Sequence, residues 1–200
     1  HGSRGKGSLF RSNGMEVPCI VRWPNGIKAG TVCDELMQST DFVPTWFDVA
    51  GAEIPKGYHL DGISFAHLFK NPDKPYRDYV FGEMGGARSI KTKDWNLITL
   101  RYPKDVIAYE DRKLKQLTGL SGGISRAGYT HKDAFDTDQL YHLGRDPGEQ
   151  VNLAGHPEHA IQLKKMMRTL SAVLEGFPDH PYGELFPGGD TTGPEEAAAL

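Results

Sequence analysis

The chain has 200 residues, and its 23 Lys and Arg against 26 Asp and Glu leave a formal net charge of −3. This balance gives no support for a nucleic-acid binder held by phosphate contacts. No run of eighteen apolar residues occurs, so no membrane span is expected, and two cysteines exclude a disulfide framework or a zinc–cysteine cluster. Hydrophobic residues make up 38%, enough for a core, while 24 Gly and 13 Pro predict many turns and long loops.

The first part of the chain predicts one strand and two helical stretches. Residues 1–15 are rich in Gly, Ser and Arg, which is the composition of a loop. Residues 17–23 form a short apolar run closed by Pro-Asn-Gly, which indicates a buried strand followed by a turn. A helix is expected to begin within residues 39–41 and to stop at Gly51, because apolar residues recur there at helical spacing. A shorter helical stretch is expected over residues 64–69.

From residue 76 onward the pattern changes to strands and a long helix. Short strands are expected over residues 79–83, 87–91, 95–102 and 139–143. Residues 103–138 are polar, with only a weak helical signal. Apolar residues at helical spacing predict a long amphipathic helix over residues 157–174, and the Gly- and Pro-rich tail from residue 176 is expected to be irregular.

Lys6 is the first candidate for chemistry. It lies between Gly5 and Gly7, and glycines let the backbone approach a ligand closely while the lysine supplies a compact charge with three donors. This arrangement suits an oxyanion such as sulfate or phosphate, although it lacks the order of a Walker A loop. The alternative is a lysine in a solvated loop.

Histidines and cysteines give weaker signals. His131 lies in the polar segment with Arg126, Tyr129 and Lys132, a cluster that could reach a sugar or an anion, or that is simply a solvated loop. His156 and His159 have a spacing that could mimic a ligand pair, but they are expected at the surface of the first turn of the long helix.

Both cysteines are expected to be unreactive. Cys19 lies in the apolar run of residues 17–23 and is expected to be buried. Cys33 has acidic neighbours, which raise rather than lower a thiol pKa.

Several segments, taken together, resemble the type I sulfatases of the alkaline-phosphatase superfamily. Residues 6–10 read Lys-Gly-Ser-Leu-Phe, similar to the lysine loop of that family, and residues 21–30 resemble its apolar strand with Trp-Pro and Ile-Lys. Further segments similar to family motifs are residues 32–51, 60–64, 77–81, 88–95, 140–143 and 146–154. They follow the family order from residue 1 to about residue 175, and the nearest branch is the N-sulfoglucosamine sulfohydrolase-like one.

The resemblance implies hydrolysis of sulfate esters or sulfamates. Lys6 matches the sulfate-binding lysine of the family, and its role would be to neutralise charge on the sulfate oxygens as the S–O bond breaks. His1 with Gly2 matches the end of a metal motif, so His1 would contact the metal or the sulfate; a rival alignment gives it no metal role. The family uses Ca²⁺ and a formylglycine nucleophile, and the resemblance places most metal ligands and the nucleophile outside this sequence.

The chain departs from the family pattern after the lysine. Residues 10–14 carry one extra residue, Arg11 replaces an acid, and Glu16 replaces an arginine. This exchange of signs leaves the substrate class open. A sulfated sugar is expected because Trp95 and several tyrosines lie where they could border a pocket: Tyr102, Tyr109 and Tyr129. His131 is a candidate substrate-binding residue there.

The resemblance implies an α/β fold, namely the C-terminal part of an alkaline-phosphatase-like sulfatase. Residues 1–75 would end the main α/β domain, and residues 76–175 would form a subdomain with a four-stranded antiparallel sheet on the long helix. Residues 176–200 would be an irregular tail whose last four residues, 197–200, resemble vector-derived sequence. The N-terminal part of the same enzyme would then be a partner.

Two alternatives stay open at this point. The chain could belong to a phosphodiesterase or phosphonate hydrolase of the same superfamily, or it could be an inactive fragment that only completes a fold. The 200 residues alone are expected to be inactive because they lack the nucleophile motif. Family members are usually exported, which implies a periplasmic, secreted or lysosomal protein.

Overall fold

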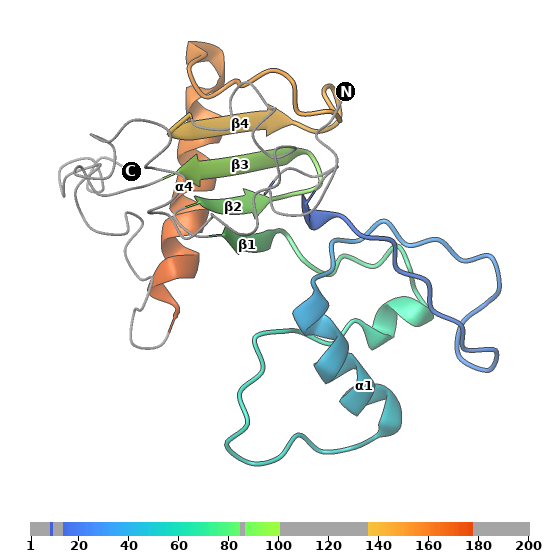
Figure 1. The fold of residues 1–200 in the computed structure, drawn as a ribbon. Helices are drawn as coiled ribbons and strands as arrows, with labels where there is room; N and C mark the ends of the chain where they lie inside the picture. The colour runs from blue at the N-terminus through green and yellow to red at the C-terminus, as the bar shows by residue number, and fades with distance from the viewer. Residues whose placement is uncertain (1–8, 10–13, 85–86, 101–135, 178–200) are drawn as a thin grey trace. The chain divides into compact units, whose positions relative to one another are not determined.

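The computed structural model describes residue 9 and residues 14–84, 87–100 and 136–177. The chain divides into two compact units. One is Pro18–Val80, and the other combines His1–Val17 with Phe81–Leu200. Figure 1 shows the helices and strands of each unit. The predicted domain boundaries at residues 75 and 175 stay predictions. No helix in the described part of the chain is long and apolar enough to cross a membrane.

A four-stranded sheet organises the second unit. Its strands are β1 (Val80–Met84), β2 (Ala87–Lys91), β3 (Trp95–Leu100) and β4 (Asp138–His142), which lie in this order across the sheet. Strands β2 and β3 pair antiparallel with Ser89 opposite Ile98, and β3 and β4 pair antiparallel with Leu97 opposite Leu140. The predicted sheet is therefore confirmed.

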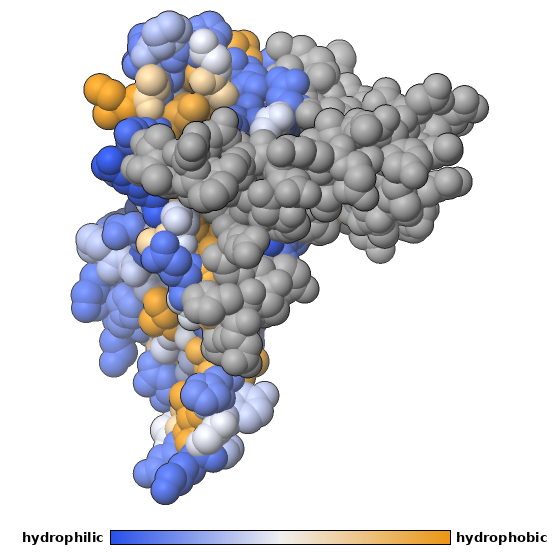
Figure 2. All heavy atoms as spheres, turned by 90° about the vertical axis from the view of Figure 1, so that its left-hand side faces the viewer, coloured by the Kyte–Doolittle hydropathy of each residue, from blue (hydrophilic) through white to orange (hydrophobic). Residues whose placement is uncertain are grey.

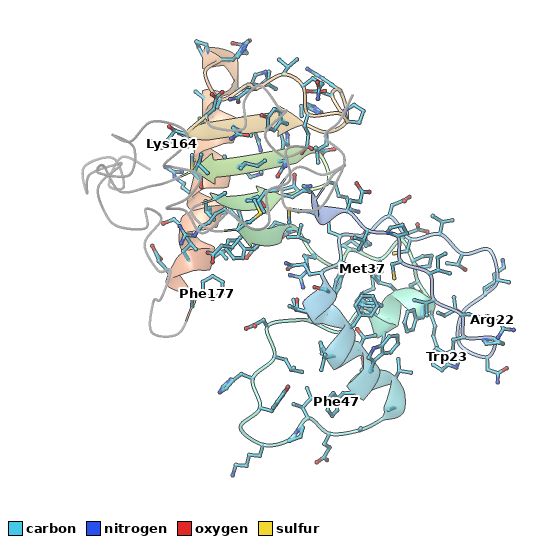
Figure 3. All side chains as sticks on the ribbon, in the orientation of Figure 1. Arg22, Trp23, Met37, Phe47, Lys164 and Phe177 are labelled. Carbon is cyan, nitrogen blue, oxygen red and sulfur yellow. The ribbon has the colours of Figure 1, made fainter. Side chains whose placement is uncertain are left out.

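One face of this sheet packs against the helix α4 (Ala160–Glu175), which follows a single 3₁₀ turn at Pro157–His159. The buried residues of α4 recur every three or four positions, as an amphipathic helix requires: Met166, Met167, Leu170 and Leu174. Burial of each leucine side chain stabilises the folded state by roughly 1.5–3 kcal/mol relative to an exposed one. Beyond the helix, the centroid of the Phe177 ring lies 5.6 Å from that of the Phe81 ring; Figure 3 labels Phe177. The predicted long helix is confirmed.

The opposite face of the sheet has its own core. Leu9 packs there with Ala87, Ile98 and Tyr141, and Met15 is packed against the same cluster. Successive residues of a strand point to opposite faces, so the polar Ser89 and Asn96 belong to this face as well. The face that binds residues 9 and 15 is called the N-segment face below.

The unit Pro18–Val80 is built around helix α1 (Phe42–Ala50), which follows a 3₁₀ turn at Ser39–Asp41. Gly51 ends α1 in the left-handed conformation, with φ of 62°, as the sequence predicted. A second 3₁₀ turn, η3 (Ala66–Phe69), lies where the short helical stretch was expected. Aromatic rings link these elements: Phe42 with Phe65, Phe65 with Phe69, and Phe69 with Trp23.

The structure corrects two expectations in this unit. Residues 17–23 form no strand, and Val17 and Ile20 are 76% and 94% exposed. A strand needs a neighbouring strand to accept its backbone hydrogen bonds, and this run pairs with none of the described strands. Cys19, expected to be buried, is exposed for the same reason.

Large apolar side chains remain exposed in this unit. Helix α1 is apolar on nearly every side, yet Val43 and Trp46 are 43% and 46% exposed. A helix that is hydrophobic all round is normally buried. Figure 2 shows hydrophobic residues beside hydrophilic ones on the visible surface of the described chain.

Candidate functional site

The segment that carries Lys6 is fixed to the sheet at Leu9, three residues later. The amide nitrogen Nδ2 of Asn96 donates to the backbone carbonyl oxygen of Leu9 over 3.2 Å. The same nitrogen donates to Oε1 of Glu149 over 2.6 Å. Leu9 is 5% exposed, and Asn96 and Glu149 are fully buried. One amide group thus uses both of its hydrogens to join the N-terminal segment, strand β3 and the turn after β4.

The position of Asn96 follows from the strand register. Asn96 lies opposite Lys91 on β2 and opposite Tyr141 on β4, so these three side chains share the N-segment face. Lys91 is 6% exposed, so a buried cationic side chain belongs to this face. A buried polar patch therefore lies under the N-terminal segment.

Glu149 reaches this patch from a tight turn. Its backbone has a φ of 54°, and its N–H donates to the carbonyl oxygen of Asp146 over 3.0 Å. The Asp146 carboxylate accepts hydrogen bonds from the N–H groups of Gln150 and Val151, at 2.6 and 2.8 Å. The Asp-Pro-Gly-Glu motif therefore forms a turn that directs Glu149 inward.

The other end of the N-terminal segment is fixed at Met15. The Ser89 hydroxyl donates to Met15 Sδ over 3.4 Å. A Cβ on Gly82 would lie 2.5 Å from Met15 Cε and 2.8 Å from Ser89 Oγ, so a larger residue there would force these side chains to shift. Residues 9 and 15 are thus both held on the N-segment face.

The three candidate site residues of the sequence, Lys6, His1 and His131, lie outside the described residues. So do Tyr102, Tyr109 and Tyr129. The predicted roles of all six stay predictions.

The structure describes Trp95 but not the other residues with which it was expected to border a pocket, so its pocket role stays a prediction. Its ring centroid lies 4.5 Å from that of His142 and 5.6 Å from that of His159, in the turn that leads into α4. Trp95 therefore lies on the helix-covered face of the sheet, opposite the face that binds Leu9. His156 is exposed and His159 partly buried, and the described residues hold no group of three or more His, Cys, Asp or Glu that could bind a metal.

In the other unit, a family motif has a structural role. Asp41 is fully buried and pairs with Nη2 of Arg77 at 2.5 Å. Its carboxylate also accepts hydrogen bonds from the N–H groups of Gln38 and Ile63. The Tyr76 hydroxyl donates to the carbonyl oxygen of Ile63 over 2.5 Å. Burial is the main cause that raises the pKa of Tyr76 above its usual 10.0.

Sequence reasoning missed Asn96, Glu149 and Arg77 as site or linking residues. Glu149 and Arg77 do lie in segments that resemble family motifs, which was the available signal. Cys33, expected to be inert, donates from Sγ to the carbonyl oxygen of Pro72 over 3.2 Å.

Comparison with known families identifies the chain. Residues 5–117 match the family model described as "N-sulphoglucosamine sulphohydrolase, C-terminal". The chain belongs to this family. The predicted resemblance to the C-terminal part of sulfatases is therefore confirmed.

The relatives of this sulfatase segment include an "Ulvan-active sulfatase" of Formosa agariphila, 29% identical over 90% of this chain and 36% of the relative. An "N-acetylglucosamine-6-O-sulfatase" of Bacteroides thetaiotaomicron is 26% identical over 85% of this chain and 27% of the relative. Human "Arylsulfatase A" is 28% identical over 86% of this chain and 33% of the relative. The chain thus spans about a third of the length of these relatives.

The fold also matches a solved structure, BT4656 in complex with its substrate D-glucosamine-2-N,6-O-disulfate. The TM-score is 0.55 at 24% identity, and the match covers 78% of this chain and 27% of that one. This likeness supports the predicted fold, the C-terminal part of a sulfatase.

Proposed function

We propose that these 200 residues form the sulfate-binding C-terminal part of an enzyme that hydrolyses sulfate esters or sulfamates of a sulfated sugar. The observation that carries the proposal is the family match over residues 5–117, which includes Lys6. Two relatives support the class of substrate, since their names are "Ulvan-active sulfatase" and "N-acetylglucosamine-6-O-sulfatase". The proposed protein is exported to a periplasmic, secreted or lysosomal compartment, as family members usually are.

In this proposal Lys6 binds the sulfate group. Its compact ammonium donates to the sulfate oxygens and stabilises the charge that grows on them as the S–O bond breaks. Such a group acts best when its position is set before the reaction. The anchors at Leu9 and Met15 support this role, because both ends of the segment after Lys6 are held on one sheet face. His131 would contact the sugar and His1 the metal or the sulfate.

Calcium is implied by the resemblance, but the described residues do not fit it. They contain no cluster of three or more His, Cys, Asp or Glu ligands. As the family resemblance implies, the proposal assigns most calcium ligands, and the formylglycine nucleophile, to parts of the enzyme outside this sequence. The exposed apolar side chains of α1, Val43 and Trp46, support a larger assembly in which the N-terminal part of the enzyme covers them.

The test compares Lys6→Ala with wild type in the full enzyme, using 4-nitrophenyl sulfate and N-acetylglucosamine 6-sulfate. Loss of one preorganised charged donor lowers kcat by about 10²–10³-fold. The matched control is Lys164→Ala, an exposed lysine on α4 (Figure 3), which leaves kcat unchanged. Activity of Lys6→Ala within twofold of wild type contradicts the assignment of Lys6.

A second measurement concerns the isolated chain. The 200 residues alone are expected to show no turnover of an aryl sulfate, because the nucleophile lies outside them. Measurable turnover by the isolated chain would show that it contains a nucleophile of its own, and the proposal in this form would be wrong.

A further inference from the structure

We infer that the outward side of helix α1 is a docking surface for the N-terminal part of the same enzyme. This side carries four apolar residues, called the α1 stripe below: Val43, Trp46, Phe47 and Ala50. The inference rests on the proposed function in one respect only, namely that these 200 residues are part of a longer enzyme. It does not depend on the role of Lys6.

The α1 stripe follows from the spacing of its residues. Positions three, four and seven residues apart lie on one side of a helix, and Val43 is followed at these intervals by Trp46, Phe47 and Ala50. Val43 and Trp46 are 43% and 46% exposed, Ala50 is exposed and Phe47 is partly buried. None of the four side chains is charged, whereas the solvent side of a surface helix is normally charged or polar.

The opposite side of α1 is polar and is held by hydrogen bonds within its own unit. The hydroxyl of the buried Thr45 donates to the carbonyl oxygen of Asp41 over 2.6 Å and accepts from the N–H of Phe65 over 3.0 Å. The Ser64 hydroxyl donates to the Asp48 carboxylate over 2.6 Å. Helix α1 is therefore amphipathic in the reverse sense, because its polar side is attached to the unit and its apolar side points outward.

The ring of Trp46 is supported from within the unit. The ring centroids of Phe42 and Trp46 lie 5.8 Å apart, and that of Phe65 lies 5.2 Å from Phe42 on edge-to-face packing. Phe65 is itself 2% exposed. A side chain that is already held in place loses little freedom when a partner covers it, so the α1 stripe is prepared for docking.

Exposed apolar side chains also occur elsewhere in this unit. Each of the following is more than two-fifths exposed: Ile20, Val32, Ile54, Tyr58 and Ile63. Single exposed apolar residues are normal on a protein surface, whereas many of them on one small unit mark a protein contact. The unit Pro18–Val80 therefore has the surface of a part that is covered in the complete protein.

The size of the α1 stripe favours an occupant in the same chain. Helix α1 has nine residues, so it is about 14 Å long and its outward side offers roughly 150 Å². A stable contact between separate molecules buries about 800 Å² on each of them, which disfavours a second copy docked through α1. A partner joined by the peptide chain has a high effective concentration, so a smaller apolar contact suffices.

The relatives contain such a partner. The matched segment makes up 36%, 27% and 33% of the length of three of them, so most of each relative lies outside the match. Uncharged apolar surfaces are typical of permanent contacts, which resemble a domain core cut in half. The α1 stripe has this composition, and its occupant is accordingly an apolar surface of the N-terminal part of the enzyme.

The test measures how fast single cysteines react with iodoacetamide in the full enzyme. Val43→Cys places a thiol on the α1 stripe, and the matched control, Asp48→Cys, places one at an exposed position on the opposite side of the same helix. Mass spectrometry of the labelled peptides gives each rate, and the rate in urea corrects for intrinsic reactivity. Because a buried thiol reacts only through local opening, Val43→Cys should be protected at least about tenfold more than Asp48→Cys.

The 200-residue chain then identifies the occupant. In this chain the protection at Val43→Cys should fall to that at Asp48→Cys, whereas Leu68→Cys, at a site 3% exposed in the same unit, should stay protected. Loss of protection at both Val43→Cys and Leu68→Cys would show that the unit folds only when it is covered, which also supports the inference.

Three kinds of result would overturn the inference. Equal protection at Val43→Cys and Asp48→Cys in the full enzyme would show that nothing covers the α1 stripe specifically. Protection that persists in the 200-residue chain would mean that this chain covers the stripe itself, or that a second copy does if the protection rises with protein concentration. Protection that appears only with phosphatidylcholine vesicles would indicate a membrane surface instead.

Should Val43→Cys fail to fold, Ala50→Cys provides the same test, because it adds a single sulfur atom at an exposed position of the α1 stripe. The labelling rates do not depend on sulfatase activity, so they separate this inference from the proposed function. A protected stripe together with full activity of Lys6→Ala would refute the role of Lys6 alone. An unprotected stripe together with an inactive Lys6→Ala would refute the docking surface alone.

Discussion

The replacement Asp41→Ala tests how the unit Pro18–Val80 is held together. Asp41 is fully buried and receives one charged donor, Arg77, and two backbone donors, Gln38 and Ile63, at 2.5, 2.8 and 2.9 Å. Alanine would leave Arg77, whose side chain is only 11% exposed, without its carboxylate. Breaking a buried pair in this way lowers the free energy of unfolding by about 3–5 kcal/mol. Because the Arg77 side chain keeps partial access to water, we expect a loss at the lower end, about 3 kcal/mol.

Urea unfolding followed by tryptophan fluorescence measures this loss. In a Trp95→Phe background the remaining tryptophans, Trp23 and Trp46, both lie in the unit Pro18–Val80. With an m-value of about 1.5 kcal/mol per M, a loss of about 3 kcal/mol lowers the midpoint by about 2 M. Asp41→Asn keeps one acceptor oxygen, so its free energy of unfolding should fall less than that of Asp41→Ala.

The control for Asp41 is Asp48→Ala. Asp48 is exposed and accepts one hydrogen bond from Ser64, at 2.6 Å. Its loss should cost no more than about 1 kcal/mol. If the midpoints of Asp41→Ala and Asp48→Ala agree within error, the buried carboxylate does not hold Arg77 and the two backbone amides as described, and the reasoning is refuted.

Three further predictions concern pH, backbone contact and the core. Because the folded state raises the pKa of Tyr76, this tyrosine contributes stability below pH 10 that is lost as the pH rises above 10. In Tyr76→Phe this alkaline loss of stability disappears. The measurement is the urea midpoint of wild type and Tyr76→Phe at pH 9 and pH 11. In Gly62→Ala the new Cβ would lie 2.1 Å from the Thr40 carbonyl oxygen, so the unfolding free energy should fall by about 2–3 kcal/mol; a midpoint equal to wild type would contradict the close contact. Leu170→Ala should cost about 2–5 kcal/mol in thermal or urea unfolding, whereas Ile161→Ala, at a site 87% exposed, should be neutral; similar losses at both sites would show that α4 does not bury the face described.

Local patterns in the sequence predicted most of the helices and strands. The long helix was recognisable because Leu170 and Leu174 lie one turn apart on the buried side. The stop of α1 was predicted from Gly51, because the left-handed conformation favours glycine. The two strands of the β2–β3 pair were predicted as short runs over residues 87–91 and 95–102. Each of these features depends on residues that are close in the chain, so the sequence contains its cause.

Family motifs predicted the family and the order of its segments, which periodicity could not, but they did not predict what each residue does. The segment with Asp41 was matched to a family motif, while its pairing with Arg77, 36 residues away, was not predicted. Lys6 was selected by its glycine neighbours and by the lysine motif, and its role in sulfate binding stays a proposal.

Only the tertiary structure decided which buried polar groups meet. Asn96 contacts Leu9 across 87 residues of chain and Glu149 across 53. No local signal marks such partners, because the free energy of a buried hydrogen bond depends on what else excludes water from it. The same reason explains why residues 17–23 form no strand and why Cys19 is exposed. An apolar run indicates only a tendency to be buried. Whether the run is buried depends on a neighbouring surface, and a sequence pattern alone does not contain that surface.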